Sequence, residues 1–201
     1  MTNCLIAGVG GQGTVLASRL ISSTALECGL NVRGAETIGM AQRGGSVLSH
    51  VRMGKSIASP LISPGQADIV LAFELCEAAR TLRYLKADGL MIACDRVIQP
   101  ASGYDPAAML DILRSSAGRL MVLQSEAIAE TCGLRALNVA LIGAACACGA
   151  FPFSVGDMER VIDTRFDAER SKMNKSALRF GETLASAGRN RRGNGERHGD
   201  D

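Results

Sequence analysis

The sequence contains a glycine-rich segment of the kind whose backbone amides bind anions. Residues 8–13 read GVGGQG, which matches the G-x-G-x-x-G pattern that cradles phosphates between a strand and a helix. In that pattern the first glycine makes a tight turn, the second admits a ligand, and the third lets the helix pack close to the strand. The candidate ligand residues are therefore Gly8, Gly10, Gly11, Gln12 and Gly13. Two other interpretations stay open: close packing of the turn, and docking of the loop onto a partner chain.

A dinucleotide site also needs an acidic residue at the end of the second strand, where it binds ribose. Glu36 is the candidate, but it follows Gly8 by 28 residues, whereas the usual separation is about 20. A stand-alone nucleotide-binding protein that uses residues 8–13 and Glu36 therefore remains an alternative.

A second segment of interest, residues 40–52, reads MAQRGGSVLSHVR. Arg43 offers a planar fork for a phosphate or carboxylate, and Gln42 can both donate and accept hydrogen bonds. Gly44 and Gly45 leave backbone amides open to a ligand or a neighbouring chain, and Ser46 follows them. We expect residues 42–46 to form an interface or ligand loop beside residues 8–13, and Arg43→Ala to impair turnover or assembly more than folding. A purely internal turn is the remaining alternative.

Other polar residues have simpler interpretations. His50 occupies an alternating strand position, so we expect a half-buried side chain bonded to a neighbour, with a proton relay as the alternative. Glu77 and Arg80 form an i,i+3 helix pair. Glu74 directly follows a strand, where either a functional role or compensation of a helix N-terminus fits its charge. No catalytic residue is assigned to this chain.

The cysteines do not have the spacing of a cluster site. Bacterial iron–sulfur motifs use C-x2-C-x2-C-x3-C, whereas the close pair here is Cys146 and Cys148 inside an apolar segment. With only His50 and His198 in the chain, a histidine-based metal site is not expected either. We expect seven reduced thiols and no metal bound by this chain.

The amino-acid composition also limits which classes of protein this chain can belong to. The 201 residues are 47% apolar, and the net charge is +2. Aromatic residues make up 3% and tryptophan is absent, so a base-stacking nucleic-acid surface is not expected. The apolar runs are short and broken by glycines, so we expect no membrane span and a cytoplasmic protein.

Hydrophobic periodicity predicts an α/β fold: a Rossmann-like, mostly parallel sheet flanked by helices, in a single domain with a helical C-terminal region. We expect one domain over residues 1–187 and a disordered polar tail over 188–201. The expected strands cover residues 3–7, 31–35, 47–53, 68–73, 89–94 and 119–123, and the expected helices cover 14–28, 74–85, 125–132, 138–149, 154–166 and 167–187.

Six segments in this order resemble the gamma-type domain of the 2-oxoacid:ferredoxin oxidoreductases, and within that family the small subunit of the indolepyruvate type. They are GVGGQGTVLA (8–17), ETIGMAQRGGSVLSHVR (36–52), SPLI (59–62), ADIVLAFELCEAAR (67–80) and the weaker NVALIG (138–143) and NKSALRFG (174–181). The resemblance spans residues 1 to about 185, and the GMAQRGGSV block is its most specific part.

The resemblance implies oxidative decarboxylation of a 2-oxoacid, most simply an aryl pyruvate, with coenzyme A as co-substrate and ferredoxin as electron acceptor. It also implies a large alpha subunit that carries thiamine diphosphate, magnesium and the iron–sulfur clusters, so that this chain binds none of them alone. In agreement, the sequence has no GDG…N motif of the kind that holds thiamine diphosphate. A gamma subunit acting on pyruvate, 2-oxoglutarate or ketoisovalerate is the alternative within the family.

Overall fold

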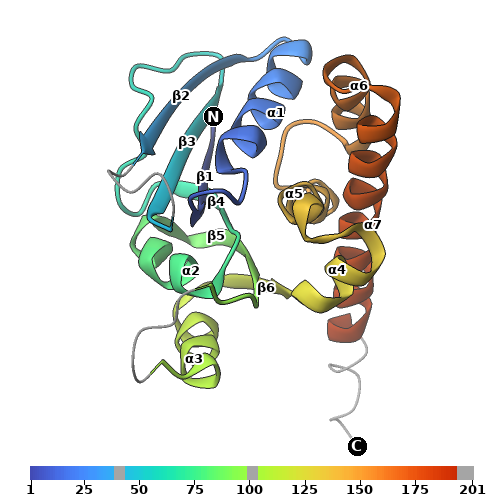
Figure 1. Cartoon of the computed structure of the whole chain (residues 1–201). Coiled ribbons are helices and arrows are strands. Elements are labelled where there is room, and N and C mark those ends of the chain that lie inside the picture. The colour runs from blue at the N-terminus through green and yellow to red at the C-terminus, as the bar shows by residue number, and fades with distance from the viewer. Residues whose placement is uncertain (39–43, 99–103, 194–201) are drawn as a thin grey trace, which may run out of the picture.

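The computed structural model describes residues 1–38, 44–98 and 104–193, and it shows a six-stranded sheet with helices on both faces (Figure 1). The strands are β1 (Thr2–Val9), β2 (Asn31–Ile38), β3 (Ser46–Gly54), β4 (Ala67–Ala72), β5 (Leu85–Cys94) and β6 (Arg119–Leu123). The helices are α1 (Thr14–Glu27), α2 (Leu75–Thr81), α3 (Pro106–Ser116), α4 (Ser125–Cys132), α5 (Leu137–Ala147), α6 (Val155–Arg165) and α7 (Ala168–Gly193). Short 3-10 turns cover Leu82–Tyr84 and Leu134–Ala136.

The strand order is β2-β3-β1-β4-β5-β6. The pairs β1–β4, β4–β5 and β5–β6 are parallel, which agrees with the expected α/β sheet, but β3 runs antiparallel to both β1 and β2. Only seven residues separate β2 from β3, and a parallel crossover needs about a dozen or more. The two strands therefore form a hairpin, and β3 separates β2 from β1 where a Rossmann fold would pair them directly.

Because β3 is antiparallel, its amino end lies at the carboxyl edge of the parallel strands. The register pairs Val9 with Ser46 and Gly8 with Val47. The turn that follows β1 and the residues that precede β3 consequently meet at one edge of the sheet. This edge is where α/β sheets bind ligands.

Two apolar cores cover the two faces of the sheet. The larger core packs α1, α4, α5, α6 and α7 against one face, and the smaller packs α2 and α3 against the other (Figure 1). Helix α5 is buried nearly throughout, as its apolar sequence predicts.

Helices α5 and α7 cross at two glycines. A Cβ atom on Gly143 of α5 would lie 1.9 Å from the Leu178 carbonyl oxygen, and one on Gly181 of α7 would lie 1.9 Å from the Ala140 carbonyl oxygen. Each glycine therefore lets the backbone of the other helix approach closely.

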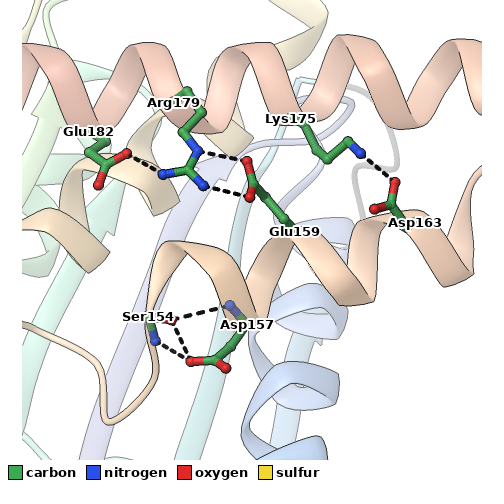
Figure 2. A network of polar contacts seen from close by, with 7 residues as sticks. All are labelled: Ser154, Asp157, Glu159, Asp163, Lys175, Arg179 and Glu182. Carbon is green, nitrogen blue, oxygen red and sulfur yellow. Dashed lines mark hydrogen bonds and ion pairs between the residues drawn. The ribbon is translucent and has the colours of Figure 1, made fainter.

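Charged side chains join α6 to α7 on the exterior (Figure 2). Arg179 makes a two-pronged contact with Glu159, at 2.7 Å from Nε and 2.6 Å from Nη2, and a third bond of 3.0 Å to Glu182. Lys175 pairs with Asp163 at 2.7 Å.

The larger differences from the predicted elements are one unpredicted helix and displaced ends of two predicted helices. Helix α3 was not predicted, although Asp105 caps it and Pro106 starts it, as helix starts favour. The helix expected over 74–85 ends at Thr81, and β5 begins at Leu85 after a 3-10 turn. Helix α7 continues to Gly193, past the expected boundary at 187, and residues 194–201 lie outside the described part.

No single helix in residues 1–38, 44–98 and 104–193 is long and apolar enough to cross a membrane. Helix α4 and the segment Leu134–Ala147 meet the length and composition test only as a pair, bent by 110°.

Candidate functional site

Gly8 does not make the predicted tight turn. It is part of β1, and the turn itself spans residues 10–13, with positive φ angles of 101° at Gly11 and 81° at Gly13. A Cβ on Gly8 would lie 2.9 Å from Gln12 Oε1 and 3.2 Å from the Phe73 ring. Gly8 thus makes room for the side chains that brace the turn, and it does not itself line the hollow beside the turn.

Gln12 is engaged within the chain. Its Oε1 accepts a 2.6 Å hydrogen bond from the Val9 amide, and its Nε2 donates to the Phe73 carbonyl at 3.2 Å. Since Val9 ends β1 and Phe73 directly follows β4, one side chain ties together the carboxyl ends of two adjacent parallel strands. The amide therefore braces the turn. Gln12 also lines the hollow beside the turn, so its ligand contact stays a prediction.

Gly13 is the N-terminal cap of α1, and no side chain caps this helix end by a hydrogen bond. A Cβ on Gly13 would lie 2.5 Å from Asn138 Nδ2, which donates a 3.2 Å hydrogen bond to the Gly13 carbonyl. Both the left-handed backbone at Gly13 and the neighbouring Asn138 of α5 therefore favour glycine here, whereas the motif predicts close packing of α1 on its own strand. Asn138 was not predicted as a site residue; its signals are an amide side chain in an otherwise apolar helix and its place at the start of the weak NVALIG motif.

A hollow of about 470 Å³ opens beside this turn. One wall is the glycine turn with the start of α1, where helix N–H groups and the positive end of the helix dipole favour an anion. Arg96, which follows β5, and Arg135, which precedes α5, add two cations. Neither arginine forms an ion pair with a carboxylate of the described residues. The remaining wall is mainly apolar, with Leu16, Ile98, Leu134 and Leu137, and Asn138 adds one amide.

The second predicted segment meets the first through its glycines. The Gly10 amide donates a 2.9 Å hydrogen bond to the Gly45 carbonyl, and Gly44 has a φ of 80°. Ser46 Oγ donates a 2.6 Å bond to Glu77 Oε2. The expectation that residues 8–13 and 42–46 meet is confirmed for the described part of the second segment. Gln42 and Arg43 lie outside the described residues.

Glu77 of α2 holds the junction between the glycine turn and the residues before β3. Its side chain is fully buried, it bonds both Ser46 and Arg80, and the Arg80 side chain is 66% exposed. The predicted i,i+3 pair is therefore present, with one partner in the interior. Glu74 caps α2 by accepting from the Glu77 amide, and burial raises the pKa of Glu74 above its usual value. This geometry supports the capping role of Glu74.

His50 has a structural environment. It is 5% exposed, its Nδ1 accepts a 3.1 Å hydrogen bond from the Ile62 amide, and its ring meets Tyr84 edge-on. Burial lowers the pKa of His50, so the imidazole is neutral at pH 7. The predicted bonded histidine is confirmed, although it is buried more deeply than expected.

Glu36 lies apart from the glycine turn. It accepts a 3.2 Å bond from Ser18 and lines a different hollow, of about 410 Å³, bounded by α1, β2, β3 and Arg165. Because β3 separates β2 from β1, the acidic residue does not line the glycine-turn pocket. The two parts of the predicted dinucleotide site are therefore not brought together.

The described residues contain no group of three or more His, Cys, Asp or Glu placed to hold a metal ion. Burial raises the pKa of Cys94 to about 11 and of Cys146 to about 12, and it raises the pKa of Cys4 further. These three thiols consequently stay protonated at neutral pH, which suits packing better than nucleophilic chemistry.

Comparison with known proteins identifies the family. Residues 3–183 match the sequence profile of the pyruvate ferredoxin/flavodoxin oxidoreductases. The chain is 36% identical over 195 residues to the indolepyruvate oxidoreductase subunit IorB of Archaeoglobus fulgidus, covering 93% of this chain and 96% of the relative.

Two solved structures share the fold. The pyruvate oxidoreductase subunit PORC of Thermotoga maritima is 22% identical, with a TM-score of 0.68 over 90% of this chain and 95% of that one. The 2-oxoglutarate:ferredoxin oxidoreductase of Magnetococcus marinus, solved with coenzyme A, is 19% identical, with a TM-score of 0.70 over 92% of this chain and 31% of that one. The match of residues 3–183, together with 36% identity to a relative along almost its whole length, shows that this chain belongs to the pyruvate ferredoxin/flavodoxin oxidoreductase family.

Proposed function

We propose that this chain is the small subunit of an indolepyruvate-type 2-oxoacid:ferredoxin oxidoreductase. The complex would convert indolepyruvate or another aryl pyruvate to the acyl-coenzyme A and transfer two electrons to ferredoxin. The observation that carries this proposal is the 36% identity to an indolepyruvate oxidoreductase subunit along 96% of that relative.

We assign the redox and decarboxylation cofactors to a large partner subunit. Thiamine diphosphate would supply the decarboxylation there, beside magnesium and iron–sulfur clusters. This chain has no GDG…N motif for the diphosphate, and its Cys146 and Cys148 do not have cluster spacing. Alone, the small subunit would therefore be inactive.

The contribution of this chain would be the pocket beside the glycine turn. The first-turn amides of α1 and the side chains of Arg96 and Arg135 suit the phosphates of coenzyme A. The apolar wall of Leu16 and Leu134 suits its uncharged pantetheine arm. We propose that this pocket guides coenzyme A toward the partner's cofactor, and that residues 42–46 form part of the adjoining subunit contact.

Co-expression with the large subunit tests the assembly. A stable complex that decarboxylates indolepyruvate is expected, and no turnover is expected from the large subunit alone. If the chain remains monomeric beside the large subunit, and the large subunit works fully without it, the proposed function is wrong.

Charge removal tests the pocket. Arg96→Gln and Arg135→Gln should each raise the KM for coenzyme A, by roughly tenfold for a lost charge-assisted contact, and leave the KM for the 2-oxoacid unchanged. Arg114→Gln is the matched control, because its arginine is 66% exposed and does not line this pocket. An unchanged KM for coenzyme A in both pocket variants would remove coenzyme A from this site.

Substrate choice separates the alternatives within the family. Turnover with pyruvate, 2-oxoglutarate or ketoisovalerate in place of indolepyruvate would reassign the complex to a sister enzyme. Tight calorimetric binding of NAD, NADP or FAD by the isolated chain would instead favour a stand-alone nucleotide-binding protein. The separation of Glu36 from the glycine turn argues against that reading.

A further inference from the structure

Asn138 is a buried amide at the point where two elements of the pocket meet. It lies in the first turn of α5, is 2% exposed, and faces the cap of α1. Its neighbours in α5 are apolar, so burial of the amide would be unfavourable unless its polar atoms were bonded.

The orientation of the Asn138 amide is determined by its two partners. The Val139 backbone N–H donates to Oδ1 at 2.9 Å, so the other end of the amide must be the NH₂ group. That group donates to the Gly13 carbonyl, which also accepts the first α1 hydrogen bond, 2.9 Å from the Ala17 amide. Asn138 therefore bonds the carbonyl from which α1 starts.

This contact bears on the direction of the first-turn amides. Gly13 adopts a left-handed conformation and has no side chain of its own to stabilise it. A glycine in a turn has many accessible conformations, so an external bond to its carbonyl restricts the entry angle of α1. The start of α1, which lines the pocket with Gly13 and Leu16, keeps its direction only while that angle is kept.

The position of α5 is in turn determined by its crossing with α7. The close approaches at Gly143 and Gly181 bring the two backbones together and leave little freedom along α5. Two weak sequence motifs, NVALIG and NKSALRFG, thereby acquire a common physical role, since they contain Asn138, Gly143 and Gly181.

We infer that Asn138 is a positioning residue for the anion-binding start of α1, held in place by the glycine crossing of α5 and α7. The inference rests on the proposed coenzyme A pocket. It adds that α5 and α7, which are distant from the glycine motif in the sequence, determine whether that motif can bind an anion.

The test uses Asn138→Ala and the isosteric Asn138→Asp in the complete complex. Aspartate retains the acceptor for Val139 but loses the donor to Gly13. Each variant should raise the KM for coenzyme A by roughly two- to tenfold, the value of one hydrogen bond, with kcat and the KM for the 2-oxoacid unchanged. Asn174→Ala is the control, because that amide is 5% exposed and donates to the Arg170 carbonyl within α7.

A second measurement is independent of turnover. Hydrogen exchange of peptides covering residues 9–20 should accelerate in both Asn138 variants, because the cap of α1 loosens, and should not change in Asn174→Ala. Unchanged exchange there, or an unchanged KM for coenzyme A in variants that assemble, would overturn the inference. Arg135→Gln separates the two proposals: if it alters the KM for coenzyme A while Asn138→Ala does not, the pocket stands and the positioning role fails.

Discussion

A methyl group added at either glycine where α5 and α7 cross should destabilise the chain. In Gly181→Ala, the new Cβ would lie 1.9 Å from the Ala140 carbonyl oxygen, about 1.5 Å short of the 3.4 Å at which ordinary contact begins. The opposing atom is helix backbone, so it cannot rotate away as a side chain could, and the helices must separate. Overpacking of this kind costs about 3 kcal/mol at the upper end of its range, and alanine's helix propensity returns about 1 kcal/mol. The free energy of unfolding should therefore fall by about 2 kcal/mol.

The reciprocal contact makes this prediction sharper. Gly143→Ala should cost a similar amount, because its Cβ meets the Leu178 carbonyl oxygen at the same 1.9 Å. The double variant should lose clearly less than the sum, since one separation of the helices relieves both clashes.

Urea unfolding followed by far-UV circular dichroism is the appropriate assay, because the chain has no tryptophan. Gly156→Ala in α6 is the matched control. Its Cβ meets only Ser154 Oγ, at 3.7 Å, so the variant should gain about 0.5 kcal/mol from helix propensity. Stability of Gly181→Ala within about 0.5 kcal/mol of the parent, or strict additivity in the double variant, would refute the reasoning.

Three further predictions concern polar groups. Because burial lowers the pKa of His50, the unfolded state takes up the proton at a higher pH than the folded state, so the free energy of unfolding should fall as pH drops below about 6.5. His50→Gln should flatten that part of the curve of unfolding free energy against pH, and an unchanged slope would contradict the assignment. Ser46→Ala should reduce the free energy of unfolding by about 1–3 kcal/mol in urea titrations, because the buried Glu77 carboxylate loses a donor; no loss would mean that the junction relaxes freely. A double-mutant cycle on Arg179 and Glu159 should give a coupling of only about 0.5–1 kcal/mol that weakens in 1 M salt, since both side chains are partly exposed; a salt-independent coupling would show stronger burial.

The strands and most helices could be predicted because their signals are local. The near-continuous apolar run of β4 and the uniformly apolar α5 each indicate burial without knowledge of their partners. The strand order could not be predicted in the same way. The insertion of β3 depends on the short connection between β2 and β3, and the sequence alone was interpreted as the start of a parallel unit.

For the candidate site, too, the local features could be predicted and the contacts between distant segments could not. The glycine motif and its meeting with residues 44–46 followed from local pattern and the carboxyl-edge rule. The partners that make the pocket, Arg96, Arg135 and Asn138, come from distant segments, and only Asn138 lies in a motif, the weak NVALIG. Gln12 has a role that the motif does not predict, because an amide inside a ligand-binding motif also braces two strands.

The bracing of the glycine turn by Gln12 has a consequence for affinity. A loop with two left-handed glycines would ordinarily lose much conformational freedom when a ligand orders it. Here the bonds from Val9 to Gln12 and from Gln12 to Phe73 restrict the loop during folding, before any ligand arrives. The loop therefore loses its conformational entropy when the chain folds and not when a ligand binds. Binding to a preorganised turn retains more of its interaction energy. A ligand at this turn should accordingly bind with little structural rearrangement, and its affinity should depend on the integrity of the sheet edge as much as on its own contacts.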